Sequence, residues 1–257
     1  MTYPESKPDL SSVRAILLDI SGVLYEGHRV IPGAVETVNA LRKLPFQIRF
    51  VTNTSTKSSE MIRQELLDMG FEIEPEELFT APIAAKRYLI EHLLRPFCLL
   101  HPDLKAEFAD IDQEDPNCVL LGDARDELTY ENLNHAFQLI EQGHPLLGIG
   151  KNKYFMSHDG LMLDSGVYIH ALEWASNTEA IILGKPDHHF FQEVVLSTGC
   201  RPGDCLMIGD DVVGDIQGAI DAGLQACLVK TGKFKDSDLA LMPPTAHLIT
   251  TINNLLD

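Results

Sequence analysis

The chain has 257 residues, of which 45% are hydrophobic, and a formal net charge of −18 at pH 7. This is enough apolar material for one large core, or for a core with an inserted second domain. The acidic excess argues against nucleic-acid binding, which needs cationic side chains to neutralise phosphates. No apolar run reaches the roughly 20 residues of a membrane helix. The polar N-terminal segment also lacks a signal-peptide pattern, so we expect no membrane association and a cytoplasmic location.

In the first part of the chain, short apolar runs alternate with segments of helical period. Residues 14–19 (RAILLD) are predicted to form a strand that ends on an acid, and residues 32–44 a helix behind Pro32. Residues 46–52 (FQIRFVT) are the next expected strand. Residues 58–70 are the next expected helix, with Ser58 or Ser59 as N-cap and Gly70 as terminator. This alternation is typical of strands joined by crossover helices in a parallel sheet.

The middle of the chain, residues 93–183, has apolar runs of its own at FCLL, CVLLG and PLLGI. Helices are predicted around residues 132–140 and 166–176. We expect this stretch to fold as an inserted α/β domain.

The last part repeats the pattern of the first. Residues 187–199 and 213–223 are predicted helices, and DCLMIGD and QACLVK are predicted strands, the former ending on Asp210. The segments 1–92 and 184–257 are therefore expected to form one Rossmann-like parallel-sheet core domain of the α/β class.

Three of the expected core strands end on a polar residue, namely Asp19, Thr52 and Asp210. In open α/β sheets ligands bind at the carboxyl ends of the strands, so these side chains are expected to converge on one pocket. Each of them alone could instead be a helix N-cap or a turn residue. The combination of three favours a site.

Four segments around these residues resemble the motifs of the haloacid dehalogenase superfamily of phosphatases. In chain order they are LLDISGVLY, FVTNTS, ILGKPD and MIGDDVVGD. Thr52 follows Asp19 by 33 residues, whereas Lys185 follows Thr52 by 133 residues, so the cap is expected between the second and third motifs. That spacing resembles the class IIA subgroup, the NagD and p-nitrophenyl-phosphatase-like enzymes with a large α/β cap. Three longer segments are similar to the phospholysine phosphohistidine inorganic pyrophosphate phosphatases within it: DISGVLYEG, GDARDELTYENLNHAF and GDDVVGDIQGAIDAGLQACLVKTGKF.

The metal expected from this chemistry is Mg²⁺, because a carboxylate nucleophile approaches a phosphoryl group only when their negative charges are offset. We expect Asp19 to attack and to form an aspartyl-phosphate. Asp19, the backbone carbonyl of Ser21 and Asp210 are the expected ligands, with Asp211 or Asp215 behind them.

The remaining charge of the phosphoryl group requires donors from the protein. Lys185 is expected to offset the charge of Asp19 and of the transferring group. The hydroxyl of Thr52 and the amide of Asn53 are expected to donate to phosphoryl oxygens.

Ser21 departs from the family pattern, since these phosphatases usually have a second Asp as general acid and base at that position. A missing acid/base group costs roughly 10²–10⁴-fold in rate. Pyrophosphate, aryl phosphates and P–N compounds tolerate its absence best, so a small phosphorylated substrate or pyrophosphate is expected. A low-turnover binding protein for phosphorylated partners is the alternative.

The inserted domain offers two candidate substrate contacts, Lys151 and Tyr154, for which a solvated loop is the other interpretation. Neighbouring histidines on a helix point about 100° apart, so His188 and His189 are not expected to form a metal site. The resemblance also implies a homodimer that pairs through the cap.

Overall fold

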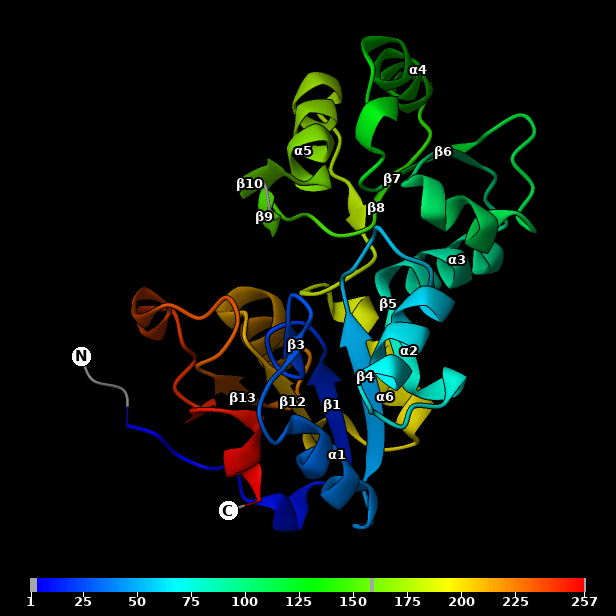
Figure 1. Cartoon of the computed structure of the whole chain (residues 1–257). Coiled ribbons are helices and arrows are strands. Elements are labelled where there is room, and N and C mark those ends of the chain that lie inside the picture. Colours follow the sequence, from blue (N-terminus) through cyan, green and yellow to red (C-terminus); the bar gives the residue numbers. More distant parts are fainter. Residues whose placement is uncertain (1–3, 158–159, 257) are drawn as a thin grey trace. The chain divides into compact units, whose positions relative to one another are not determined.

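The computed structural model describes residues 4–157 and 160–256, which divide into two compact units (Figure 1). The core unit comprises residues 1–52, 62–79 and 185–257, and the inserted unit comprises residues 53–61 and 80–184. None of the helices in the described ranges is long and apolar enough to cross a membrane.

The core unit is built on a six-stranded sheet with the order β14-β13-β12-β1-β4-β5. Its strands are β1 (Ala15–Asp19), β4 (Gln47–Thr52), β5 (Leu78–Thr80), β12 (Cys205–Gly209), β13 (Gln225–Val229) and β14 (His247–Ile249). The central strand β1 pairs in parallel with β12 on one side and β4 on the other. Every residue of β1 and β12 is buried, as expected for strands covered on both faces.

Helices follow the core strands in the predicted order. They are α1 (Ala34–Arg42), α2 (Ser59–Asp68), α6 (His188–Thr198) and α7 (Gly218–Asp221), and a short hairpin of β2 (Tyr25–Glu26) and β3 (Arg29–Val30) follows β1. The backbone N–H of Met61 donates to Ser58 Oγ, which caps α2 as expected, and Gly70 adopts a φ of +92° after its end. The α/β class predicted from the sequence is confirmed.

The inserted unit contains a second, four-stranded parallel sheet with the order β11-β8-β7-β6. Its elements are β6 (Pro96–Leu99), β7 (Cys118–Leu121), β8 (Leu146–Gly148) and β11 (Ile181–Ile182), a hairpin of β9 (Tyr154–Ser157) and β10 (Gly160–Leu163), and α3 (Ala81–Glu91), α4 (Tyr130–Glu141) and α5 (Ser165–Ser176). Successive residues of β7 alternate between two apolar clusters. Leu120 packs with residues of α3, and Val119 packs with residues of α4 and α5.

The inserted unit begins earlier in the chain than the expected boundary at residue 92, because it includes helix α3. Ala85 and Leu89 are buried on this helix and pack with Leu100 and Leu147 of the inserted unit. The helix therefore belongs to that unit, because its small apolar face completes the second core rather than the first.

Candidate active site

The carboxyl edge of the core sheet brings the three predicted strand-end residues together. Asp19 ends β1, Thr52 ends the adjacent strand β4, and Asp210 follows β12 on the other side. All three are buried, with 7%, 4% and 1% of their surface exposed. Parallel pairing produces this convergence, because neighbouring strands end at the same edge.

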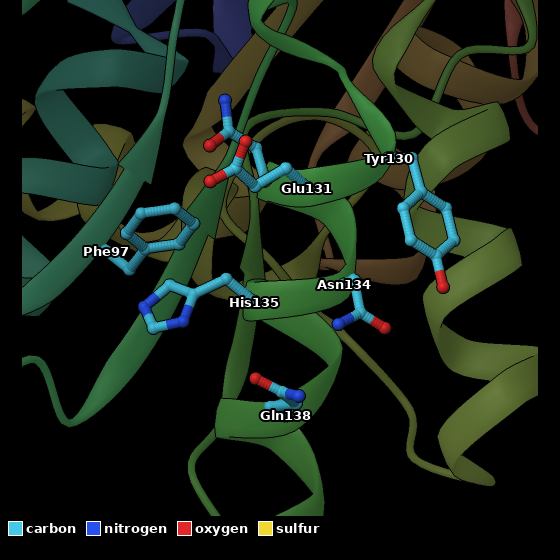
Figure 2. Close-up of a pocket in the computed structure, with 7 residues that line it drawn as sticks. Phe97, Tyr130, Glu131, Asn134, His135 and Gln138 are labelled. Carbon is cyan, nitrogen blue, oxygen red and sulfur yellow. The ribbon is translucent and has the colours of Figure 1, made fainter.

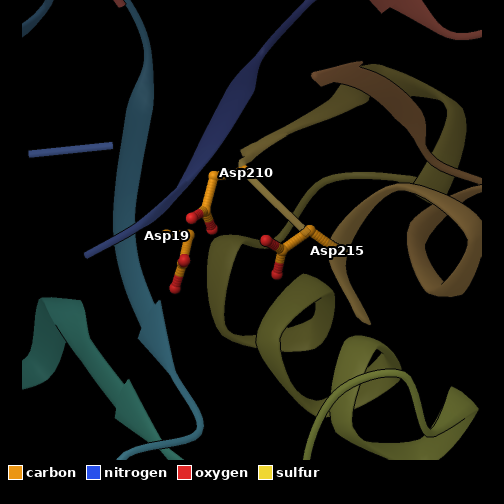
Figure 3. Close-up of side chains that lie close together, drawn as sticks. All are labelled: Asp19, Asp210 and Asp215. Carbon is orange, nitrogen blue, oxygen red and sulfur yellow. The ribbon is translucent and has the colours of Figure 1, made fainter. Parts of the chain in front are cut away.

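A third carboxylate, Asp215, joins Asp19 and Asp210 in a compact buried cluster (Figure 3). One oxygen from each of the three residues lies within 4.8 Å of the others. Asp215 comes from the π-helical turn Val212–Gln217, in which Ile216 N–H donates to the carbonyl of Asp211 five residues back. Such wide turns are frequent at functional sites.

Asp211 is not a member of the carboxylate cluster that contains Asp215, although both residues were expected behind the metal. Its carboxylate accepts the backbone N–H groups of Val213 and Gly214 and so caps the turn. Burial alone would raise the pKa of Asp211. The hydrogen bonds from Gly214 and Val213 and the charge of Lys233 outweigh burial, so the pKa lies below its usual value.

Lys185 links two members of the cluster. Its Nζ lies 2.7 Å from Asp19 Oδ1 and 2.6 Å from Asp215 Oδ1, and only 5% of its side chain is exposed. Burial disfavours the ammonium charge, but the two carboxylates outweigh burial and raise the pKa of Lys185. One ammonium therefore faces three buried carboxyl groups, and the site has a surplus of negative charge.

Burial and this surplus of negative charge raise the pKa of Asp210 further than that of Asp215. Burial, and then the charges of Asp19 and Asp215, raise the pKa of Asp210 to about 8, and burial raises that of Asp215 to about 6. Asp210 Oδ1 is buried with no hydrogen-bond partner among the described residues. An unpartnered buried oxygen within a set of carboxylates fits a hard divalent cation such as Mg²⁺, which prefers oxygen ligands.

The loop after β13, which received no role from the sequence, also positions Asp210. The backbone N–H of Lys233 donates to Asp210 Oδ2 over 2.6 Å, and the hydroxyl of Thr231 donates to the carbonyl of Gly22. Gly22 and Gly232 have φ values of +88° and +67°, and a Cβ on either would lie 2.0 Å from Asp210 Oδ2. Both glycines are therefore required by close approach as well as by backbone conformation. Gly232, three residues after the end of β13, was the signal available in the sequence.

The other expected site residues lie as follows. Ser21 is exposed and forms a β-bridge with Tyr25 after β1, and Asn53 is half-buried at the start of the inserted unit. Within that unit, Lys151 Nζ lies 2.6 Å from Glu173 Oε1, and Tyr154 is 53% exposed.

The histidines after Lys185 have no metal-binding arrangement. Asp187 accepts the backbone N–H groups of His189 and Phe190 and caps α6. Within residues 4–157 and 160–256, the one group of possible metal ligands is the Asp19, Asp210 and Asp215 cluster.

Two family models match the parts of the chain that build this site. A haloacid dehalogenase-like hydrolase model matches residues 16–114, and a HAD-hydrolase-like model matches residues 182–256. The chain belongs to the haloacid dehalogenase superfamily. The family expected from the four motifs is thereby confirmed.

Individual relatives of this haloacid dehalogenase protein are phosphatases and hydrolases. Phospholysine phosphohistidine inorganic pyrophosphate phosphatase of Xenopus laevis is 45% identical, covering 89% of this chain and 87% of that protein. Haloacid dehalogenase-like hydrolase domain-containing protein 2 of Homo sapiens is 39% identical, covering 92% of both.

Solved structures agree with the class IIA assignment. A 4-nitrophenylphosphatase from Thermotoga maritima superposes with a TM-score of 0.87 at 25% identity, covering 96% of this chain and 97% of that one. A putative nagD protein shares the fold with a TM-score of 0.85 at 24% identity, covering 96% and 99%. This chain is therefore an enzyme of the haloacid dehalogenase phosphatase family.

The charge surplus leads to a prediction for the metal-free protein. The pKa of Asp210 is raised above its unfolded value of 3.8, so stability should fall as the pH rises from about 4 through about 8. Asp210→Asn removes this cost. We expect it to raise the unfolding temperature in chelator at pH 7 by about 4–8 °C, and to flatten the pH dependence. Calorimetry at several pH values measures both effects.

The same experiment with added Mg²⁺ tests the ligand role of Asp210. Mg²⁺ should stabilise the wild type and should no longer stabilise Asp210→Asn. The control is Asp221→Asn, a matched change at an exposed position of α7. A less stable metal-free Asp210→Asn protein with an unchanged Mg²⁺ response would contradict this interpretation.

Proposed function

We propose that this enzyme is a magnesium-dependent phosphohydrolase that acts on pyrophosphate, phosphoramidates or small phosphate esters through an aspartyl-phosphate at Asp19. The observation that supports it most is the ion pair of Asp19 with the buried Lys185, beside the unpartnered oxygen of Asp210. Together these groups supply a nucleophile, a fixed positive charge and an oxygen ligand for a cation.

The first half of the reaction uses Asp19 and Lys185. A carboxylate oxygen of Asp19 forms a bond to phosphorus, and the bond to the leaving group breaks with its electron pair. Lys185 remains charged beside Asp19 and stabilises the negative charge of the transferring group. In the second half, water attacks the phosphorus of the aspartyl-phosphate, which releases phosphate and restores Asp19.

A Mg²⁺ ion would be held by Asp19, Asp210 and the backbone carbonyl of Ser21, with Asp215 and Asp211 beside them. When bound, it supplies neutralisation of negative charge on the phosphoryl oxygens. Asp211 serves by capping the turn that carries Asp215, which keeps that carboxylate beside Lys185.

Thr52 and Asn53 complete the proposed phosphate contacts. Thr52 is the buried last residue of β4 and follows Val51, which is paired with Asp19 of β1. The amide of Asn53 follows it in the chain. Both would donate to phosphoryl oxygens, as Lys185 does.

The substrate class follows from the exposed hydroxyl of Ser21, which provides no acid or base of useful pKa. Leaving groups that depart without a proton are therefore favoured. The names of two relatives, phospholysine phosphohistidine inorganic pyrophosphate phosphatase and 4-nitrophenylphosphatase, agree with such leaving groups. They favour turnover over the alternative of a low-turnover binding protein.

In the inserted unit, we propose Lys151 and Tyr154 as substrate contacts and the aromatic surface around α4 and α5 as a homodimer interface. Tyr130 and Trp174 are 85% and 81% exposed, which is unusual for such large rings. A hollow of about 560 Å³ adjoins α4, and in it the rings of Phe97 and His135 meet edge to face at 4.6 Å (Figure 2).

We also propose a cytoplasmic location, with which the five free cysteines agree.

The catalytic proposal predicts phosphate release that depends on Mg²⁺ and on Asp19. Asp19→Asn should lower the rate by at least about 10³-fold, because the amide is a poor nucleophile. Excess chelator should abolish turnover of pyrophosphate, an imidodiphosphate and p-nitrophenyl phosphate alike. Asp221→Asn is the matched control. Full activity in chelator, or in Asp19→Asn, would refute the mechanism.

The role of position 21 is tested by Ser21→Asp. The new carboxyl group should protonate an alkoxide leaving group, which pyrophosphate largely does not need. We expect the ratio of kcat/KM for an alkyl phosphate to that for pyrophosphate to rise about tenfold or more. An unchanged or smaller ratio would reject the role of this position.

The assembly proposal predicts a dimer mass by light scattering at micromolar concentration. Trp174→Glu should shift the protein toward the monomer, because it places a charge in the apolar contact. Leu44→Glu, at an exposed apolar position of the core unit, is the control. A monomer mass for the wild type would exclude the interface.

A further inference from the structure

A second hollow lies beside the acidic cluster, entirely within the core unit. It has a volume of about 200 Å³. Its lining includes Asp210 and Asp211 of the acidic site and two lysines, Lys233 and Lys235, together with Asp238 and Leu241. The mechanism above uses the acids on one wall and leaves the lysines unexplained.

The main chain at Lys233 is held firmly in place. Its N–H donates to Asp210 Oδ2, and the preceding Gly232 N–H donates to Glu26 Oε1 over 2.7 Å. Thr231 is bonded to the carbonyl of Gly22. The position of the Lys233 backbone therefore depends on contacts that a change of its side chain would leave intact.

The side chain of Lys233, in contrast, is only loosely engaged. Its Nζ lies 3.6 Å from Asp211 Oδ2, beyond hydrogen-bond distance, and 63% of the side chain is exposed. Asp211 Oδ1 already accepts the N–H groups of Val213 and Gly214. Within the described part of the chain, the ammonium group of Lys233 thus has no fixed hydrogen-bond acceptor and lines an open hollow.

The side chain of Lys233 is expected to remain protonated and positively charged. Burial opposes this charge, but Asp211, Asp210, Asp19 and Asp215 outweigh burial and raise the pKa of Lys233. A cation next to the cluster can also attract a second anionic group of a substrate. Lys185 is already bonded to Asp19 and Asp215, so a second anionic group on a substrate requires a different cation.

We infer that Lys233 determines specificity by binding the anionic leaving group of a diphosphate-like substrate through Nζ. This inference rests on the proposed phosphohydrolase function. The phosphoryl group that is transferred contacts Lys185, and the phosphoryl group that departs contacts Lys233. A substrate with an uncharged leaving group makes no use of this contact.

Binding of an anion by the Lys233 ammonium can be distinguished from a purely structural role of this side chain. Loss of the ammonium removes attraction for an anion and, at the same time, removes repulsion of a cation at Asp210. Lys233→Met should therefore weaken diphosphate binding and tighten Mg²⁺ binding. Disturbance of the loop would weaken both.

Titration calorimetry at saturating Mg²⁺ tests this with two ligands that are not hydrolysed, methylenediphosphonate and methylphosphonate. In Lys233→Met we expect methylenediphosphonate to bind about tenfold more weakly, and methylphosphonate to change less than about twofold. Lys233→Arg should restore most of the affinity because it keeps the charge. Lys43→Met, at an exposed lysine after α1, controls for the lost positive charge.

Kinetics separate this inference from the proposed function. In Lys233→Met the KM for pyrophosphate should rise about tenfold while that for p-nitrophenyl phosphate stays within about twofold. If the wild type releases phosphate from neither compound, the proposed function fails and the calorimetric comparison still decides the role of Lys233. Equal weakening of both phosphonates, or unchanged methylenediphosphonate affinity, would overturn the inference.

Discussion

The rest of the site depends on the buried ion pairs of Lys185 with Asp19 and Asp215. Buried charges are tolerated only when they are paired, and Lys185 pairs with Asp19 and Asp215 while Asp210 Oδ1 has no hydrogen-bond partner among the described residues. The fold thus holds an arrangement that is electrostatically incomplete. A divalent cation bound there would compensate the surplus carboxylate charge, and an anionic phosphoryl group could then approach even though the protein has a net charge of −18.

The geometry of the core sheet makes this arrangement possible. Parallel pairing of β1 with β4 and β12 places three strand ends at one edge. Gly22, Gly209 and Gly232 leave the space that Asp210 and Asp215 occupy, since a Cβ on any of them would lie within 2.2 Å of a carboxylate oxygen. We expect the buried carboxylates at this edge to lower the stability of the metal-free protein, as is common at active sites.

Asp19, Thr52 and Asp210 could be found in the sequence because each ends an apolar run, and their convergence follows from parallel pairing. The place of Asp215 could not, since it depends on a π-helical hydrogen bond between Ile216 and Asp211 that no periodicity reveals. The contribution of Lys233 was also hidden, because its contact with Asp210 comes from the backbone. Helix α3 was missed as part of the insert because its buried face is formed largely by small residues, such as Ala81 and Ala85.

The most direct test of the account is chemical trapping of the intermediate on Asp19. The enzyme would be mixed with Mg²⁺ and pyrophosphate, quenched in acid during turnover and reduced with borohydride, which converts an aspartyl-phosphate to homoserine. Peptide mass spectrometry should then find homoserine at position 19, and none at Asp210, Asp211 or Asp215. Continued turnover with an unmodified Asp19, or homoserine at one of the other three positions, would contradict the assignment of Asp19 as the nucleophile.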